Sequence, residues 1–204
     1  MSIWTKTIGA SFLGVSVLLL MGCSLSSSRV GPQGEPLHPT LTRSSYIERG
    51  KLLTVVVGTR PTRIRDEAKF MPLEIAVANN GMESLTVTRE SFTLVNGDGS
   101  KRYSVVSAEE LRDTDYNVDV DRRLGEVLPV MNDKYTNYER VASNLSPSFD
   151  APSERSPVRL SRFSWLYDYI YFPWPEGGVE EQSFDLLFKT REMENPVVVR
   201  FAVE

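Results

Sequence analysis

An acidic segment at 113–121, DTDYNVDVD, carries an oxygen-bearing side chain at every second position. The five side chains are those of Asp113, Asp115, Asn117, Asp119 and Asp121. Ca²⁺ takes about six to eight oxygen ligands, and calcium loops of the EF-hand kind space their ligands in a similar way. The spacing therefore marks this run as a candidate Ca²⁺ site.

The same run departs from an EF-hand loop in two places. Val118 stands where the sharp turn requires glycine, and Leu124 stands where the bidentate glutamate belongs. The alternative is an extended edge, with Tyr116, Val118 and Val120 pointing inward and the carboxylates in water. We favour the extended edge and no cofactor, and keep a Ca²⁺-binding module as the alternative.

A second candidate lies at 162–175, RFSWLYDYIYFPWP, where aromatic residues alternate with a mainly apolar opposite face. The aromatic row comprises Trp165, Tyr167, Tyr169 and Tyr171, and Trp174 follows it. Rings with polar tips suit glycan stacking or a protein interface. The simpler alternative is that the row packs on the core or under a neighbouring segment. If the domain has an exposed surface that contacts a partner, we predict that this row forms it.

Residues for nucleophilic or metal chemistry are few. The single cysteine, Cys23, and the single histidine, His38, both precede residue 46. The domain that follows thus lacks the usual bases, nucleophiles and soft-metal ligands. A carboxylate-dependent hydrolase is a third function class, but nothing in the sequence selects a pair of acids. We therefore predict that the protein is not an enzyme.

The position of Cys23 predicts where in the cell the protein is located. Lys6 precedes an apolar run at 8–21 that is shorter than the roughly 20 residues of a membrane span, as in an export signal. The sequence Leu20-Met21-Gly22-Cys23 resembles the lipobox of bacterial lipoproteins, in which the cysteine thiol accepts a diacylglycerol. The alternative is an incidental cysteine in an ordinary secretory signal.

The lipoprotein resemblance implies a signal peptide at 1–22 and a palmitate-bearing Cys23 that holds the chain in the cell envelope. Several acyl chains on one cysteine exceed what stable anchoring requires. Ser24 stands where an inner-membrane retention signal would place Asp. By resemblance to proteobacterial sorting, this favours the outer membrane if the host is Gram-negative.

Composition bounds the remainder. Removing 1–22 leaves 22 basic and 27 acidic residues, and this mildly acidic balance argues against nucleic acid as a partner. The segment 23–45 is rich in Ser, Pro and Gly and reads as a flexible tether with a solvated His38. The rest, 46–204, suits a single domain. Its loop GTRPTRIRDE at 58–67 reads as solvated, with Asp66 and Glu67 compensating its arginines.

Strand signals recur at short spacing through the domain. They lie at 51–58, 70–81, 85–88, 91–96, 101–107, 182–190 and 195–203. Gly97-Asp98-Gly99-Ser100 predicts a hairpin turn. Ser107 and Glu110 form a capping box that predicts one short helix. The long segment 113–181 has weak regular signals and is treated as an insertion.

The strand series at 51–107 and 176–203 resembles the Ig-like accessory domains of bacterial surface lipoproteins. The quoted signals are a strand ending in Asn-Asn-Gly, the SFTLVNGDG hairpin and a final pair of apolar strands. The resemblance implies an all-β fold, an Ig-like antiparallel β-sandwich with a short helix and a long insertion. The function we expect is a non-catalytic, lipid-anchored envelope protein that binds an unidentified envelope protein or has a structural role. The alternative is a Ca²⁺- or glycan-binding module.

Overall fold

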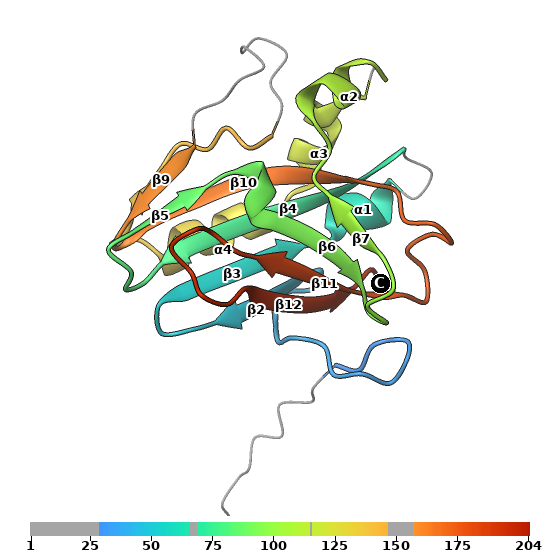
Figure 1. The fold of residues 1–204 in the computed structure, drawn as a ribbon, viewed down its shortest axis with the longest axis horizontal. Coiled ribbons are helices and arrows are strands. Elements are labelled where there is room, and N and C mark those ends of the chain that lie inside the picture. Colours follow the sequence, from blue (N-terminus) through green and yellow to red (C-terminus); the bar gives the residue numbers. More distant parts are fainter. Residues whose placement is uncertain (1–28, 66–68, 115, 147–156) are drawn as a thin grey trace, which may run out of the picture.

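A computed structural model describes residues 29–65, 69–114, 116–146 and 157–204. In this part of the chain, twelve strands form an all-β sandwich of antiparallel sheets, with one short parallel pair (Figure 1). The six-stranded sheet runs β1 (Thr40–Thr42), β2 (Ser45–Arg49), β3 (Leu53–Gly58), β4 (Phe70–Asn79), β10 (Ser164–Pro173) and β8 (Glu139–Arg140). The four-stranded sheet runs β12 (Val197–Ala202), β11 (Ser183–Phe188), β6 (Phe92–Asn96) and β7 (Arg102–Ser104). A separate pair joins β5 (Ser84–Val87) to β9 (Val158–Ser161).

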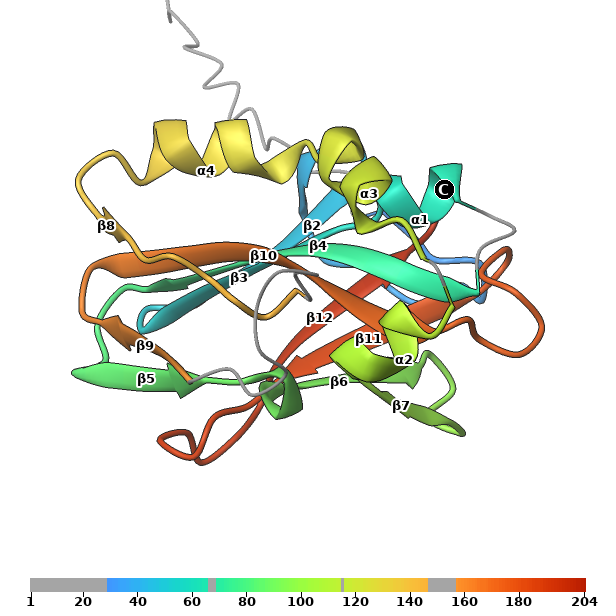
Figure 2. The ribbon, with the colours of Figure 1, turned by 90° about the horizontal axis from the view of Figure 1, so that it is seen from above.

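Short helices cover the outer face of the six-stranded sheet. They are α1 (Arg60–Ile64), α3 (Val118–Leu124) and α4 (Val127–Lys134), with α2 (Ala108–Arg112) at one end and a 3-10 turn, η1 (Arg89–Ser91), before β6. Figure 2 shows the resulting layers, with the helices on one side, the six-stranded sheet in the middle and the smaller sheets on the other side. The large sheet is therefore covered on both faces, and all ten residues of β4 are buried.

The core between the sheets follows the predicted alternation. Leu73, Ile75 and Val77 of β4 face the four-stranded sheet, and each is fully buried. The same core contains Leu166, Ile170 and Phe172 of β10 and Phe184, Leu186 and Phe188 of β11. Alternate residues of a strand point to opposite faces, so this pattern fixes which side chains meet the helices instead.

The predicted strands and hairpin are confirmed. The turn between β6 and β7 places Gly99 at φ 76°, a left-handed conformation that glycine adopts without strain. The predicted capping box is also present: the Glu110 amide donates to Ser107 Oγ at 3.1 Å, and the Ser107 amide donates to Glu110 Oε2 at 2.9 Å. That helix is α2. The sequence predicts this one short helix beside the strands, and it does not predict α1, α3 or α4.

The expected tether is too long. Leu37 is buried in the core. The strand β1, which lies within the segment expected to be flexible, pairs with β2. His38 is also not free in water: its Nδ1 accepts from the Arg200 amide at 2.8 Å, and its Nε2 lies 3.3 Å from Glu48. The high Pro and Gly content of this segment predicts flexibility, but Leu37 packs in the core and β1 pairs with β2.

The segment 113–181 is also not a plain insertion. Its strand β10 pairs with β4 along ten consecutive residues, from Ser164 opposite Asn79 to Pro173 opposite Phe70. This strand is an integral part of the large sheet, and α3 and α4 lie over the sheet it completes (Figure 2).

Candidate functional site

The acidic run forms a helix rather than an extended edge. Asn117 caps α3 by accepting a hydrogen bond from the Asp119 amide at 3.1 Å. Acidic residues in the first turn and arginines in the last complement the helix dipole, which explains why this run is helical. The expectation of an extended edge is therefore wrong, although Val118 is buried as predicted.

The helix also separates the candidate Ca²⁺ ligands. Asp119 pairs with Arg122 at 3.0 Å on the surface, whereas Asp121 is buried and pairs with Arg65 at 3.1 Å. Asp115 lies outside the described residues, and Asp113 follows the end of α2. Among the residues that the structure describes, no group of three or more His, Cys, Asp or Glu side chains could hold a metal ion.

The aromatic row lies on the helix-facing side of β10, where it is covered. Trp165, Tyr169 and Tyr171 are each at most 2% exposed. Trp165 packs with Val127 and Met131 of α4, and the two tyrosines pack with residues around α2 and α3. The prediction that the row is an exposed contact surface is therefore wrong for these three residues, because their rings pack between the sheet and the helices. Tyr167 and Trp174 are only partly buried, and both also pack against the buried clusters.

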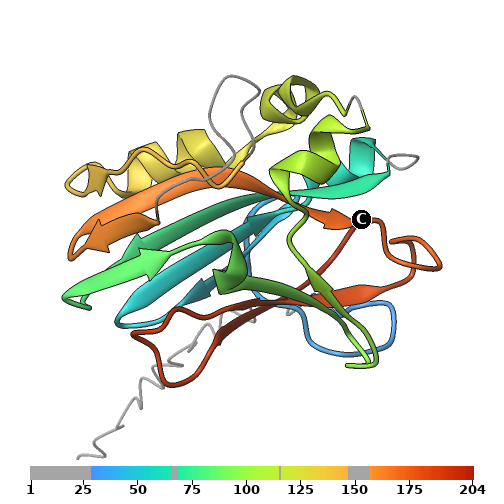
Figure 3. The same ribbon diagram turned by 45° about the horizontal axis from the view of Figure 1, so that its top comes forward.

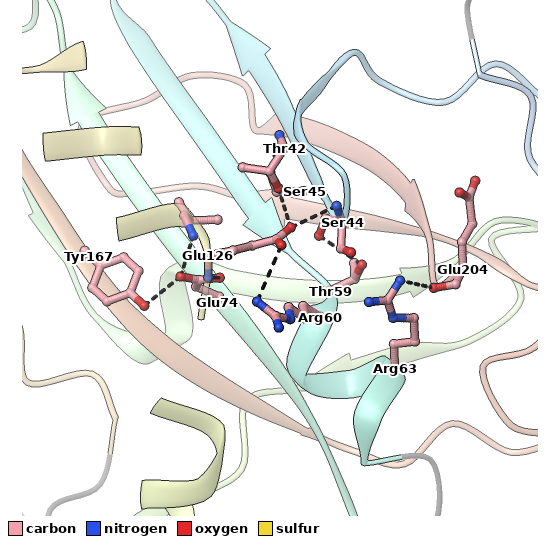
Figure 4. Close-up of polar contacts among 11 residues, drawn as sticks. Thr42, Ser44, Ser45, Thr59, Arg60, Arg63, Glu74, Glu126, Tyr167 and Glu204 are labelled. Atoms are coloured by element: carbon pink, nitrogen blue, oxygen red, sulfur yellow. Dashed lines mark hydrogen bonds and ion pairs between the residues drawn. The ribbon is translucent and has the colours of Figure 1, made fainter. Parts of the chain in front are cut away.

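A buried carboxylate, Glu74, joins the helices to the sheet. It projects from β4 beside the row, and its side chain is fully buried. Its oxygens accept from the amides of Val127 at 2.8 Å and Glu126 at 3.0 Å and from the Tyr167 hydroxyl at 2.7 Å (Figure 4). Burial raises the pKa of Glu74, and these hydrogen bonds oppose that rise. Glu74 thus caps the start of α4 from the neighbouring strand.

Two glycines make room for this carboxylate. A Cβ at Gly125 would collide with the hydroxyl of Tyr169 and come within 2.8 Å of Glu74 Oε1 and the Tyr167 hydroxyl. A Cβ at Gly58 would lie 2.7 Å from Glu74 Oε2. The backbone must approach closely here, so glycine is required for packing although neither residue has a positive φ.

The next carboxylate along the chain extends the same network. Glu126 accepts from the Ser44 amide at 2.9 Å and from the Thr42 hydroxyl, and it lies 4.0 Å from Arg60 (Figure 4). Asp66 and Glu67, which were expected to compensate the arginines of 58–67, lie outside the described residues, and these arginines have other described partners. Arg60 begins helix α1, and Arg63 donates to the Glu204 carbonyl at 3.3 Å.

A second buried acid fixes α3. Asp121 lies beside Tyr116 and Tyr171, whose rings meet edge to face with centroids 5.7 Å apart. Burial raises the pKa of Asp121 to about 6, and the adjacent Arg65 guanidinium limits the rise. Arg65 also stacks over the Tyr116 ring at 4.5 Å. Arg65, which follows α1, thus forms a structural ion pair with Asp121 of α3.

A polar pocket of about 300 Å³ lies beside these helices, at the edge of β10. Asp168 contributes to its wall and accepts from the amides of Leu145 at 2.7 Å and Ser146 at 3.0 Å. Arg122 reaches Ser146 Oγ at 3.3 Å across the pocket. Asp168 of β10 lies opposite Ile75 of β4, whereas Glu74, the residue before Ile75, lies opposite Tyr169. The two acids therefore start from opposite faces of the sheet, and each is engaged in holding backbone.

A larger apolar groove of about 830 Å³ opens at the far end of the sandwich. Its lining comes largely from the β2–β3 turn and the loop between β11 and β12. These two connections lie near each other at one end of the molecule (Figure 3). The apolar lining of the groove comes from Leu52, Leu53, Met82, Met193 and Val197. Leu52 is 55% exposed, and it stands next to the other apolar residues of the lining, so the groove is a contiguous apolar surface rather than one isolated exposed leucine.

The sequence offered little signal for this groove or for Glu74. Glu74 stands inside an apolar strand, FMPLEIAVAN, and a charge there is the one hint of a buried polar contact. The groove is built from turns 140 residues apart in the chain, at Lys51–Leu53 and Glu192–Asn195, so only the fold brings its sides together.

Comparisons with known proteins add one structural likeness. No protein-family model and no curated protein matches the chain. A solved structure of a candidate lipoprotein, ycdA from Bacillus subtilis subsp. subtilis str. 168, matches with 12% identity and a TM-score of 0.39. The match covers 76% of this chain and 38% of the other. The chain thus spans less than two fifths of that structure, and a likeness at this TM-score assigns neither fold nor function.

No helix within the described ranges is both long and apolar enough to span a membrane.

We expect Glu74→Ala to lower the free energy of unfolding by about 3 kcal/mol, because two amides and a tyrosine hydroxyl lose their buried acceptor. Chemical denaturation of the full chain measures this change. The matched control is Glu139→Ala, an exposed glutamate in β8, which should change stability by less than about 0.5 kcal/mol. Equal effects of the two substitutions would contradict the role assigned to Glu74.

Asp121 gives a prediction for pH. Its pKa is raised in the folded state, so between about pH 4 and 6 the native protein binds more protons than the unfolded chain. The contribution of Asp121 to stability therefore falls as pH rises through this window, by about 2 kcal/mol. Urea unfolding at pH 4.5 and 7 should show that Asp121→Asn loses this dependence, whereas Asp119→Asn on the surface keeps it. A pH dependence unchanged in Asp121→Asn would refute the assignment.

Proposed function

We propose that this chain is a non-catalytic, lipid-anchored protein of the cell envelope that binds another envelope protein through the apolar groove. The observation that carries the binding role is the groove itself, which keeps Leu52 exposed beside Met82, Met193 and Val197. Exposed apolar concavities of this kind are typical of ligand and protein contacts. The aromatic row no longer competes as a contact surface, because the helices cover it.

The anchor rests on Cys23 and the apolar run before it, which lie outside the described residues. Arg29 pairs with Glu204 at 3.0 Å, so the first described residues lie beside the C-terminal end of β12. The β2–β3 turn and the β11–β12 loop, which line the groove, lie at the other end of the sandwich (Figure 1). Anchoring would confine the domain to a thin layer and raise its effective concentration toward neighbours in the same membrane.

The lipid anchor predicts a labelling result. Cells supplied with an alkyne analogue of palmitate should label the wild-type chain, and Cys23→Ala should abolish the label because it removes the acceptor thiol. Ser26→Ala, three residues further on, is the matched control and should still be labelled. Label that persists in Cys23→Ala would show that the lipid is attached elsewhere and would refute this anchor.

The binding role is tested by photocrosslinking in cells from a crosslinking amino acid placed at Met193. We expect one dominant envelope partner whose yield falls about tenfold in Leu52→Asp, since a charge in the groove opposes apolar contact. Ile64→Asp is the matched control, because Ile64 is 47% exposed but lies on α1, away from the groove. Equal yields in the two variants, or no dominant partner, would contradict a binding role for the groove.

A further inference from the structure

On its outer side, β12 has no strand partner among the described residues, and this edge leads to the groove. β12 is the edge strand of the four-stranded sheet, where it pairs with β11 on one side only. On its other side, the Arg200 amide donates to His38 Nδ1 at 2.8 Å, and the Arg200 carbonyl accepts from the His38 amide at 3.0 Å. The backbone of Arg200 therefore points away from β11, and the chain's own segment pairs with it there.

The same geometry leaves Val198 open. In an antiparallel pair, alternate residues of a strand direct both backbone groups to the same side. The N–H and C=O of Val198, two residues before Arg200, thus also point away from β11. In the described part of the chain no backbone hydrogen bond reaches this side of Val198. His38 ends the chain's own pairing one step before the groove.

The groove continues from this open edge. Val197 lines it directly, with Leu53 and Met193 on its walls. A strand placed beside Val198 would project every second side chain toward that apolar surface. The backbone edge and the groove together form a site for an extended segment, in which main-chain hydrogen bonds supply affinity and the groove selects apolar side chains.

Charges around the groove favour one kind of segment. Its rim carries three carboxylates, Glu48, Glu192 and Glu194, against one ammonium group, that of Lys51. Glu192 is already used, because it accepts from the Thr86 hydroxyl at 2.7 Å and pairs with Arg191. Glu194 is exposed and forms no ion pair among the described residues. A basic residue in the bound segment would therefore find a complementary charge.

We propose that an extended, basic segment of a partner protein adds as a strand to β12 at Val198. Its alternate apolar side chains enter the groove, and a Lys or Arg reaches Glu194. This assignment rests on the proposed function, which it deepens by naming the class of partner and the mode of contact.

The test uses the full chain and short fluorescein-labelled peptides of alternating valine and threonine, flanked by lysines or by glutamates. Fluorescence polarisation should show that the lysine-flanked peptide binds and that a version with a central proline does not. Val198→Pro should weaken binding about tenfold, because it removes the outward N–H without removing a bond to β11. The matched control is Ser104→Pro, on β7 at the opposite edge of the same sheet, which should bind normally.

A second variant leaves the backbone unchanged. Glu194→Lys should transfer the preference from the lysine-flanked to the glutamate-flanked peptide, with thermal unfolding of every variant measured alongside. The inference is overturned if the lysine-flanked peptide does not bind, or if Val198→Pro and Ser104→Pro bind it equally. It is likewise overturned if sedimentation shows that the groove is filled by a second copy of this chain.

The outcomes separate this inference from the proposed function. If Met193 crosslinks a dominant envelope partner in cells but Val198→Pro leaves that yield unchanged, the binding role stands and strand addition fails. If neither crosslinking nor peptide binding is seen, both fail.

Discussion

The Glu74 carboxylate lies between the six-stranded sheet and the helical layer, and the arrangement of that layer depends on it. A charge-bearing group inside a strand is costly to bury unless its oxygens are hydrogen-bonded. Here they accept from Glu126 and Val127 at the start of α4 and from Tyr167 on β10. An eight-residue helix is marginal by itself, so α4 depends on this attachment and on the packing of Met131 against Trp165. Gly58 and Gly125 are the backbone positions that leave room for the carboxylate.

That attachment decides which surface of the domain can meet a partner. Once α3 and α4 are fixed on the sheet, the aromatic face of β10 is closed, and Asp121 and Arg65 close its other end. The apolar surface that stays open lies at the end of the sandwich, between Leu52 and Met193. The domain thus has its buried polar interactions under the helical layer and its exposed apolar groove at one end of the sandwich, whereas Arg29 pairs with Glu204 at the other end.

The strands and the capped helix could be predicted because their signals are local. Alternation at Leu73, Ile75 and Val77 and the capping box at Ser107 each act within a few residues. The acidic run forms a helix and not the expected extended edge, because alternating acids suit a first helical turn as well as an exposed strand, and the Asn117 cap favours the helix. The closure of the aromatic row depends on helices from elsewhere in the sequence. Glu74 and the groove depend on contacts across more than 50 residues, which no local pattern records.

Hydrogen exchange at the start of α4 tests this account most directly. The amides of Glu126 and Val127 should exchange as slowly as those in the centre of β4, because a buried carboxylate accepts from both. In Glu74→Ala, protection should be lost across Val127–Lys134 while β3 and β4 keep theirs, and the aromatic row should become accessible. Rapid exchange of these two amides in the wild-type chain, or unchanged protection of α4 in Glu74→Ala, would contradict the claim that Glu74 holds the helical layer in place.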